Sequence, residues 1–552
     1  MSEPIATTSD ADIGRHARLI GSITLVSRLL GLVRESKAAD AFGASAVWSA
    51  FTFAFSIPNL FRRLFGEGAL AAAFIPLYAQ SRKSADPEHV EQSRRFASAS
   101  VNLLLLILLA ITILGELLLI SLLTLDMRAD YVLGLKLTMV MLPYVMLVCG
   151  TAFCGAILQV HARFAATAST SLVLNACLIA AIYLASFRLD LSSEQGKERG
   201  VMWLAFSVLV AGVIQIAMLV PSLRAVGFRF DWRVSLWSPM VRKMLLLSVP
   251  VALGAGVLQI STLLDKSIAF FLAAGDGQSH FQILGHSIAY PMIEGAAARL
   301  NWAQFMYQFP LGVFAIALAT AIFPKLASSV VTGEQVGDDF RRVLRRGIES
   351  SLLIGLPATV GMVVIAQPAV QLLFERGRFT SADTHLTALS TAIYSAAIWA
   401  FSLQQILNRA FYALHDTKTP LVWGMWNLLI NLAVELPLIW TGLGEGGMAV
   451  GTLVAFSVQA IAMTWMLSRR VDGIGFGQIK TNVIKMVVAS LLMGVVCVAV
   501  RAACAGYLPL HHKSAQALQV AAIACVGGVV YFAACELMGL RTLRDMLRRR
   551  RK

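Results

Sequence analysis

The sequence predicts an all-α polytopic membrane protein with about fourteen transmembrane helices. These are expected to form two pseudo-symmetric six-helix lobes around a central cavity, with two further C-terminal helices. Three observations predict this fold class: the composition, the length of the apolar runs and the placement of the basic residues. Of the 552 residues, 57% are hydrophobic and only 14% are charged, whereas soluble domains are roughly 45–50% apolar and about 25% charged. No soluble core could bury that much apolar surface, so the composition indicates a lipid environment.

Fourteen apolar runs match the length of a membrane-spanning helix, which is about 20 residues. The runs at 101–125 and 204–220 are the most continuous, while arginines interrupt the first one. Because the first run has no small-residue cleavage site, we expect a retained membrane helix and not a signal peptide. The approximate centres of the predicted spans are Gly31, 56–70, Leu109, Val145, Cys177, Val210, Leu258, Ile316, Gly361, Ala396, Leu429, Phe456, Leu492 and Gly527.

Basic residues gather in every second loop between the predicted spans. Because cytoplasmic loops are enriched in Lys and Arg, both termini are expected to be cytoplasmic. The net charge of +15 is then explained by topology and by contact with lipid headgroups, and no nucleic-acid partner is expected. The basic loops on the predicted cytoplasmic side hold Arg82, Lys83, Arg94, Arg95, Arg341, Arg342, Arg345, Arg346, Arg469 and Arg470, and the basic tail 541–552 follows.

An internal repeat divides the chain. Ala-Leu-Ala-Ala-Ala-Phe-Ile-Pro-Leu-Tyr-Ala at 69–79 and Ala-Leu-Ala-Thr-Ala-Ile-Phe-Pro-Lys-Leu-Ala at 317–327 are identical at six of eleven positions. Both copies end a span that runs in the same direction and precedes a basic loop, which is typical of two parallel halves. We therefore expect an N-terminal lobe at 15–225, a C-terminal lobe at 240–470, two further helices at 480–540 and a cytoplasmic tail at 541–552.

The motifs of soluble enzymes are missing from the sequence. It contains no Walker loop, no His-Glu-x-x-His and no Gly-x-Ser-x-Gly motif. The seven cysteines lie in apolar runs without paired spacing, and the nine histidines are scattered. The chain is therefore expected not to be an enzyme and to hold no cofactor. An ion gradient of Na⁺ or H⁺, or the membrane potential, is the expected energy source.

Charged residues inside the first two spans are the main functional signal. An ion in lipid costs several kcal/mol, so it needs a reason to be there. Guanidinium groups clamp phosphate oxygens through paired donors, and this predicts a phosphate-bearing substrate held by Arg28, Arg34 and Arg62. Arg28 and Arg34 lie about 120° apart on an ideal helix, so a bend at Gly31 would bring them to one wall. The full set of candidate substrate-binding residues is Arg28, Arg34, Glu35, Arg62, Arg63 and Glu67.

A structural role for these charges remains an alternative. Arg28 and Glu35 share a helix face at i, i+7, and Arg63 and Glu67 have the i, i+4 spacing of an ion pair, so both can be pairs within one helix. An arginine can also extend its side chain to the membrane interface.

A second polar set lies in the predicted C-terminal lobe. Asn431 and Glu435 are four residues apart and share a helix face, and Asp265 and Thr452 lie on other predicted spans. Oxygen ligands from several helices suit a hard cation, so these four residues are a candidate sodium site. The alternative is that Asp265 pairs with Lys266 and that Glu435 lies near the outer interface.

Four segments resemble the MurJ (MviN) family of lipid II flippases in the MOP exporter superfamily. They are Ser-Arg-Leu-Leu-Gly-Leu-Val-Arg-Glu at 27–35, Ala-Phe-Gly-Ala at 41–44, Ile-Pro-Asn-Leu-Phe-Arg-Arg-Leu-Phe-Gly-Glu-Gly-Ala at 57–69, and Arg-Ala-Phe-Tyr-Ala-Leu-His-Asp-Thr-Lys-Thr-Pro at 409–420. Carried over by position, the family's cavity arginines correspond to Arg28, Arg34 and Arg62, and their acidic partner to Glu35.

The resemblance implies a role in peptidoglycan biosynthesis, cell wall biogenesis and cell shape. The implied transport step moves an undecaprenyl-pyrophosphate-linked glycopeptide to the outer leaflet of the bacterial inner membrane by alternating access. The implied partners are membrane lipid and the cell-wall synthesis machinery, and the last two helices would form a groove for the lipid tail. Some relatives hold sodium at positions like those of the second polar set.

Two positions depart from the family pattern. Ser49 stands where the family usually has an aspartate, and Phe305 stands where the eighth span usually has an arginine. Arg299 or Lys266 is a candidate replacement for that arginine. Three other functions stay open: a multidrug-type exporter of the same fold, a polysaccharide-unit flippase, and a membrane scaffold. The arginines of the first two spans favour an anionic lipid-linked substrate over cationic drugs.

Overall fold

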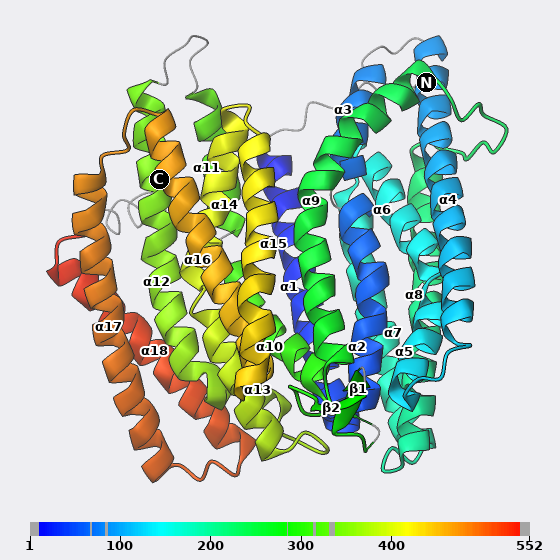
Figure 1. Cartoon of the computed structure of the whole chain (residues 1–552). Helices are drawn as coiled ribbons and strands as arrows, with labels where there is room; N and C mark the ends of the chain where they lie inside the picture. The colour runs from blue at the N-terminus through cyan, green and yellow to red at the C-terminus, as the bar shows by residue number, and fades with distance from the viewer. Residues whose placement is uncertain are drawn as a thin grey trace. The chain divides into compact units, whose positions relative to one another are not determined.

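A computed structural model describes residues 10–66, 69–82, 87–275, 277–283, 285–312, 316–329 and 337–540. The chain forms two compact units, one ending at Ile288 and the other beginning at Ala289 (Figure 1). Two parts of the sequence prediction, Glu67 and the basic tail 541–552, lie outside the described residues.

The first unit is built from nine α-helices. Between the second and third of them, a π-helical segment, η1, covers Arg62–Gly66. The α-helices are α1 (Asp10–Phe42), α2 (Ala46–Phe61), α3 (Ala69–Ser81), α4 (Pro87–Leu122), α5 (Ala129–Met141), α6 (Tyr144–Val160), α7 (Phe164–Arg188), α8 (Glu194–Ala225) and α9 (Pro239–Phe271).

The second unit is also helical. Its helices are α10 (Ala296–Pro310), α11 (Ile316–Ser328), α12 (Asp338–Phe374), α13 (Ser381–Ser395), α14 (Ile398–Ala413), α15 (Lys418–Leu438), a 3₁₀ turn η3 (Ile439–Thr441), α16 (Glu445–Arg470), α17 (Phe476–Tyr507) and α18 (Lys513–Leu537).

Short polar signals set where several helices begin. The hydroxyls of Ser45, Ser193 and Ser238 accept hydrogen bonds from backbone N–H groups in the first turns of α2, α8 and α9, which satisfies donors that have no partner inside the helix. Thr380 forms a capping box with Asp383 at the start of α13. Helices α5 and α6 meet at an angle of 41°, where Pro143 lacks the N–H that would continue the helix.

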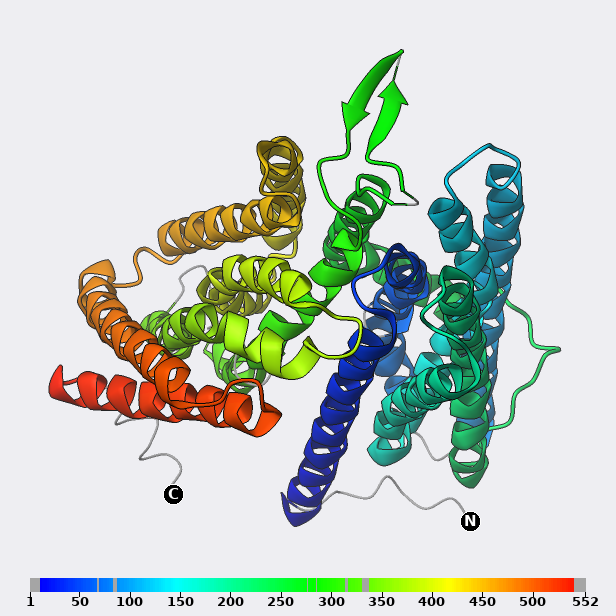
Figure 2. The ribbon, with the colours of Figure 1, turned by 90° about the horizontal axis from the view of Figure 1, so that it is seen from below.

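A two-stranded hairpin interrupts the helical pattern. Strands β1 (His280–Ile283) and β2 (His286–Ala289) pair with each other and are drawn as two arrows in Figure 2. The sequence predicted an all-α chain, so this prediction is wrong at the hairpin. The segment is too short for its strands to show a repeating hydrophobic pattern.

Helix contacts place α9 in the first unit, where it packs against α2, α3 and η1. The other main contacts in this unit join α1 to α7, α7 to α8 and α2 to α5. In the second unit, α15 packs along α16, and α12 contacts α13, α14 and α17. The sequence prediction assigned the residues of α9 to the C-terminal lobe at 240–470. It rested on the internal repeat, which reflects the order of segments along the chain and carries no information on contacts.

A π-helical segment, η1, separates α2 from α3 within the second predicted span. Leu311 and Gly312, which follow α10, are also π-helical. Helices α3 and α11, which begin after these segments, contain the two copies of the repeat, with Pro76 and Pro324 at matching positions. The match between the two halves thus extends from sequence to backbone geometry. Such π-helical turns often mark functional sites.

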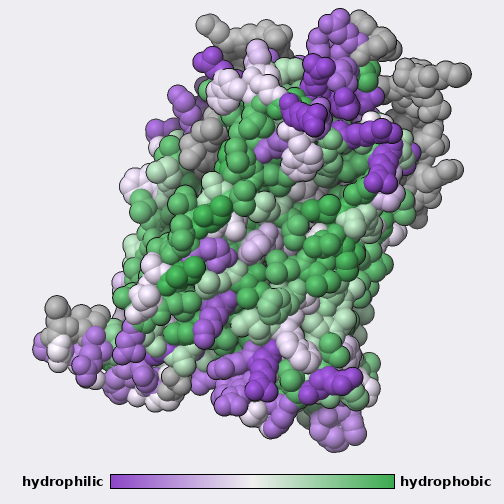
Figure 3. All heavy atoms as spheres, turned by 90° about the vertical axis from the view of Figure 1, so that its right-hand side faces the viewer, coloured by the Kyte–Doolittle hydropathy of each residue, from purple (hydrophilic) through white to green (hydrophobic). Residues whose placement is uncertain are grey.

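Nine helical segments of the described chain are long and apolar enough to cross a membrane, or ten if the bent pair α5–α6 is one span. Helix α1 does not meet that test, since it carries Arg28, Arg34, Glu35 and Lys37 within ten residues. Figure 3 shows a broad hydrophobic band between hydrophilic ends on one face of the molecule. The chain is therefore a multi-pass membrane protein.

Candidate functional site

Arg34, on α1, contacts two neighbouring side chains. It forms an ion pair with Glu35, and its Nη1 donates to Oδ1 of Asn175 at 3.0 Å. The Arg34 side chain is 20% exposed and that of Glu35 is 7% exposed. A guanidinium has five N–H donors, and these two contacts use two of them. Arg34 therefore keeps donors for a ligand while its position is held.

Asn175 on α7 holds this part of α1 in place. Its Nδ2 donates to the carbonyl of Ser27 at 3.2 Å, and the Ser27 hydroxyl donates to Ser171 at 2.9 Å. An isolated amide in an apolar helix is costly unless it is hydrogen-bonded. The three contacts explain why α7 carries an asparagine, and they fix the rotation of α1 that directs Arg34.

The two arginines of η1 point to different neighbours. The Nη1 of Arg63 donates to Oε1 of Gln259 on α9 at 3.2 Å. Arg62 donates through Nε and Nη2 to Oδ1 of Asn59, at 3.1 and 2.9 Å, and its charge acts on Tyr144 at the start of α6. Adjacent residues of a helix project in directions about 100° apart, so only one of the pair faces α9.

Lys266, on α9, is a further charged residue at this site. The charges that act on it are those of Arg63, Glu35, Arg34 and Asp265. The side chains of α1, η1 and α9 therefore place two further cations and two carboxylates within electrostatic range of Lys266. We call these five residues the charged cluster.

The other predicted residues stand apart from this cluster. Arg28 is half-buried and has no hydrogen bond or ion pair recorded with any residue that the structure describes. The alternative pairing of Arg28 with Glu35 is not seen, because Glu35 pairs with Arg34. Ser49 is buried on α2, and Phe305 is partly buried on α10.

The second polar set is assembled in part. Asn431 and Glu435 on α15 are buried, and the Asn431 Nδ2 donates to Oε2 of Glu435 at 3.1 Å. Thr452 on α16 donates to Oδ1 of Asn431 at 3.3 Å. Gly451 allows this approach, since a Cβ there would lie 2.9 Å from the Cβ of Glu435 and 3.0 Å from the Asn431 carbonyl.

Asp265 belongs to the first unit, so three of the four predicted cation ligands meet in the second. No group of three or more His, Cys, Asp or Glu side chains that could hold a metal occurs in the ranges given above. The candidate ligands of the second unit are one carboxylate, one amide and one hydroxyl. They are hard oxygen donors, as sodium requires.

Arg299 is not available as a replacement for the arginine that Phe305 lacks. Its side chain is 1% exposed, and it forms ion pairs with Glu445 and Asp383. It also donates to the carbonyls of Glu294 and Ile293. These contacts tie the first turns of α10, α13 and α16 together, so the role of Arg299 is structural. Lys266 is the other predicted candidate.

Sequence reasoning missed Asn175 and Gln259, which contact the arginines. Each is an amide in a long apolar run, and that isolation was the available signal. It also missed the ion pair between Arg128 and Asp130, both of which are buried. Arg128 also donates to the carbonyl of Ala273, just after the end of α9, at 2.9 Å.

Known proteins resemble this chain over most of its length. The family model described as "Lipid II flippase MurJ" matches residues 38–513. A probable lipid II flippase MurJ of Rhizobium tropici is 32% identical over 487 residues, which are 87% of this chain and 85% of that protein. A probable lipid II flippase MurJ of Vibrio cholerae is 31% identical over 451 residues, 79% of each chain.

Solved structures show the same fold at lower identity. A lipid II flippase MurJ in an inward closed conformation matches with a TM-score of 0.72 at 21% identity, covering 96% of this chain and 99% of that one. An inward-facing multidrug resistance transporter of the MATE family matches with a TM-score of 0.64 at 14% identity, covering 83% and 98%. The chain therefore shares its fold with these two transporters.

Proposed function

The chain belongs to the MurJ family of lipid II flippases, and we propose that its charged cluster holds the pyrophosphate of lipid II during transfer to the outer leaflet. The observation that carries this proposal is the arrangement of Arg34, Arg63 and Lys266 with Glu35 and Asp265 on α1, η1 and α9. Cations in a membrane protein are costly unless they are neutralised. The negative charges of a phosphate-bearing ligand stabilise them.

Each cation has a separate task in this proposal. Arg34 offers a planar fork of donors whose direction Asn175 sets, and this suits two oxygens of one phosphate group. Arg63 lies on η1, and Gln259 on α9 orients its side chain. Lys266 supplies a point charge and takes the place of the arginine that Phe305 lacks. Glu35 keeps Arg34 in position and limits how tightly the substrate is held.

Transfer follows from alternating access of two lobes related by the repeat. The matching π-helical segments support such a relation, in which one half rocks against the other. We infer fourteen spans, with both termini in the cytoplasm and a groove for the lipid tail at 480–540. The membrane potential contributes about 2.3 kcal/mol per elementary charge per 100 mV, and the headgroup supplies the charge on which it acts.

Complementation tests the proposal directly. Cells depleted of their own lipid II flippase should grow when this chain is expressed, and lipid II should become accessible to a probe outside the cell. A multidrug-type exporter would give neither result. Growth without outer-leaflet lipid II would contradict the proposal, as would correct membrane insertion without either outcome.

Lys266→Met should lower the rate of lipid II appearance in the outer leaflet by about tenfold, the effect of one lost charge-assisted hydrogen bond. Lys266→Arg should retain most of the rate, since the positive charge persists. Lys243→Met is the matched control, because Lys243 is exposed near the start of the same helix. Equal rates in Lys266→Met and wild type would show that Lys266 does not take the place of the missing arginine.

Sodium is the proposed coupling ion, held by Asn431, Glu435 and Thr452 of the second unit. Sodium at ten times its dissociation constant should stabilise the purified protein by about 1.4 kcal/mol relative to the same concentration of potassium. Glu435→Gln should remove this difference because it removes the carboxylate charge. If sodium still stabilised Glu435→Gln more than potassium does, the ion would bind elsewhere. If sodium did not stabilise the wild type more than potassium does, protons would become the preferred coupling ion.

A further inference from the structure

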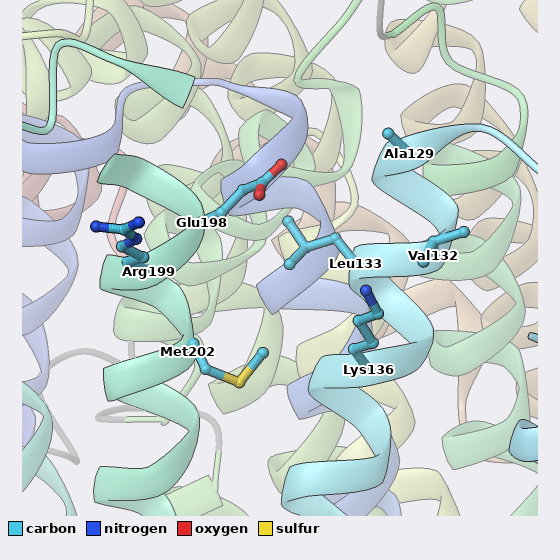
Figure 4. Close-up of a pocket in the computed structure, with 7 residues that line it drawn as sticks. All are labelled: Ala129, Val132, Leu133, Lys136, Glu198, Arg199 and Met202. Carbon is cyan, nitrogen blue, oxygen red and sulfur yellow. The ribbon is translucent and has the colours of Figure 1, made fainter. Parts of the chain in front are cut away.

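A cavity of about 520 Å³ lies between the first turns of α5 and α8 in the first unit (Figure 4). Its volume is in the range of small-ligand sites, which are roughly 300–1,000 Å³. The charged residues that line it are Lys136, Glu198 and Arg199, and apolar lining comes from Val132, Leu133 and Met202. None of these residues belongs to the charged cluster or to the second polar set.

The three charges of this cavity are unpaired. Within the described parts of the chain, no hydrogen bond or ion pair is recorded for Lys136, Glu198 or Arg199, and all three are exposed. Neighbouring charged residues do form ion pairs: Lys197 pairs with Glu194, and Arg128 pairs with Asp130. In Figure 4 the side chains of Lys136 and Glu198 extend into the space between the two helices.

The charges of the cavity lie near the ends of two helices, where a membrane-spanning helix meets the headgroup layer. Helix α5 begins at Ala129 and α8 at Glu194, so at 1.5 Å per residue the charges lie about 6–10 Å inside the helix ends. The apolar part of α8 begins at Val201, next to Met202, and Leu135 and Leu137 on either side of Lys136 are buried.

We propose that this cavity binds the headgroup of an aminophospholipid. Lys136 and Arg199 take the phosphate, Glu198 takes the ammonium group, and Val132 and Met202 contact the first part of an acyl chain. Charges of both signs in one cavity match a zwitterion, whereas a purely anionic headgroup would face the carboxylate of Glu198. With both termini in the cytoplasm, as proposed above, the cavity lies at the outer leaflet; the binding itself does not depend on that orientation.

Native mass spectrometry of the full chain in detergent tests this site, with phosphatidylethanolamine and phosphatidylglycerol as the two lipid probes. Wild type should retain the ethanolamine lipid preferentially. The double change Lys136→Gln and Arg199→Gln should weaken its binding by tenfold or more, as expected for lost charge-assisted hydrogen bonds. Glu198→Gln should reduce the preference for the ethanolamine lipid over the glycerol lipid to about one.

Two further variants separate lost binding from lost folding. Lys197→Gln removes a charge from the same turn of α8 without touching the cavity, and it should bind as wild type does. The exchange Lys136→Arg and Arg199→Lys keeps both charges and should retain the lipid.

Three results would overturn the proposal. The first is equal binding of the ethanolamine lipid to wild type and to the double glutamine variant. The second is equal binding of both lipids to wild type. The third is binding of soluble glycerophosphoethanolamine as tight as that of the whole lipid, which would identify a soluble phosphodiester as the ligand.

Discussion

Replacing Arg34 by methionine should abolish growth of cells that depend on this chain and should leave lipid II in the inner leaflet. Arg34 is both paired with a carboxylate and oriented by an amide from another helix. Its loss removes two or more charge-assisted hydrogen bonds to the pyrophosphate, each worth about 1.5–3 kcal/mol. It also leaves Glu35 facing the substrate, which adds repulsion. The combined effect is about a hundredfold or more in the transfer rate.

Two comparisons make this result specific. Arg34→Lys keeps the charge but loses the planar fork, so it should recover only part of the activity. Lys37→Met is the matched control, because Lys37 lies one turn further on α1 and pairs with Asp40 outside the cluster. Growth supported by Arg34→Met at matched membrane levels would exclude the cluster as the phosphate site, even if the chain is a flippase.

Arg299→Met should cause the largest loss of stability, about 3–5 kcal/mol, as expected when one partner of a buried ion pair is removed. Glu445 is 4% exposed and Asp383 is 16% exposed at their side chains, so both carboxylates would lose their counter-charge in a poorly solvated place. Two backbone carbonyls would also lose their donor. Thermal unfolding of the detergent-solubilised protein measures the effect as a lower melting temperature.

A second substitution distinguishes charge from packing in this network. Adding Glu445→Gln to Arg299→Met should restore part of the stability, because it removes one uncompensated buried charge. Arg469→Met is the control, since Arg469 is exposed and its change should stay within about 0.5 kcal/mol. If Arg299→Met melts like wild type, the network does not hold the ends of α10, α13 and α16 together.

The arginine-rich cluster also separates this chain from its structural neighbours of the MATE family. The likeness to those transporters, at 14% identity, concerns the fold. Substrate class depends on the side chains that the fold presents. A charged cluster that offers Arg34, Arg63 and Lys266 suits an anion and disfavours a cationic drug.

The sequence by itself determined the membrane class, the family and the helices that carry the functional charges. These properties are local. An apolar run of about 20 residues has the length of a membrane-spanning helix, and a charged residue within such a run is recognised directly from the sequence. Each predicted span centre lies on an α-helix or at the break between two consecutive ones. The π-helical segment at Arg62 and the hairpin at β1 and β2 were not predictable from such runs, because a single turn leaves no periodic pattern.

Only the tertiary structure decided which charges meet. It brought Arg63 to the α9 side together with Arg34, while Arg62 turned toward Asn59 and Tyr144. It added Lys266 to the cluster and enclosed Arg299 in an ion network. Such pairings depend on how each helix is rotated about its axis and which helix it packs against. Those two quantities arise from contacts between residues far apart in the chain, and no local pattern of the sequence records them.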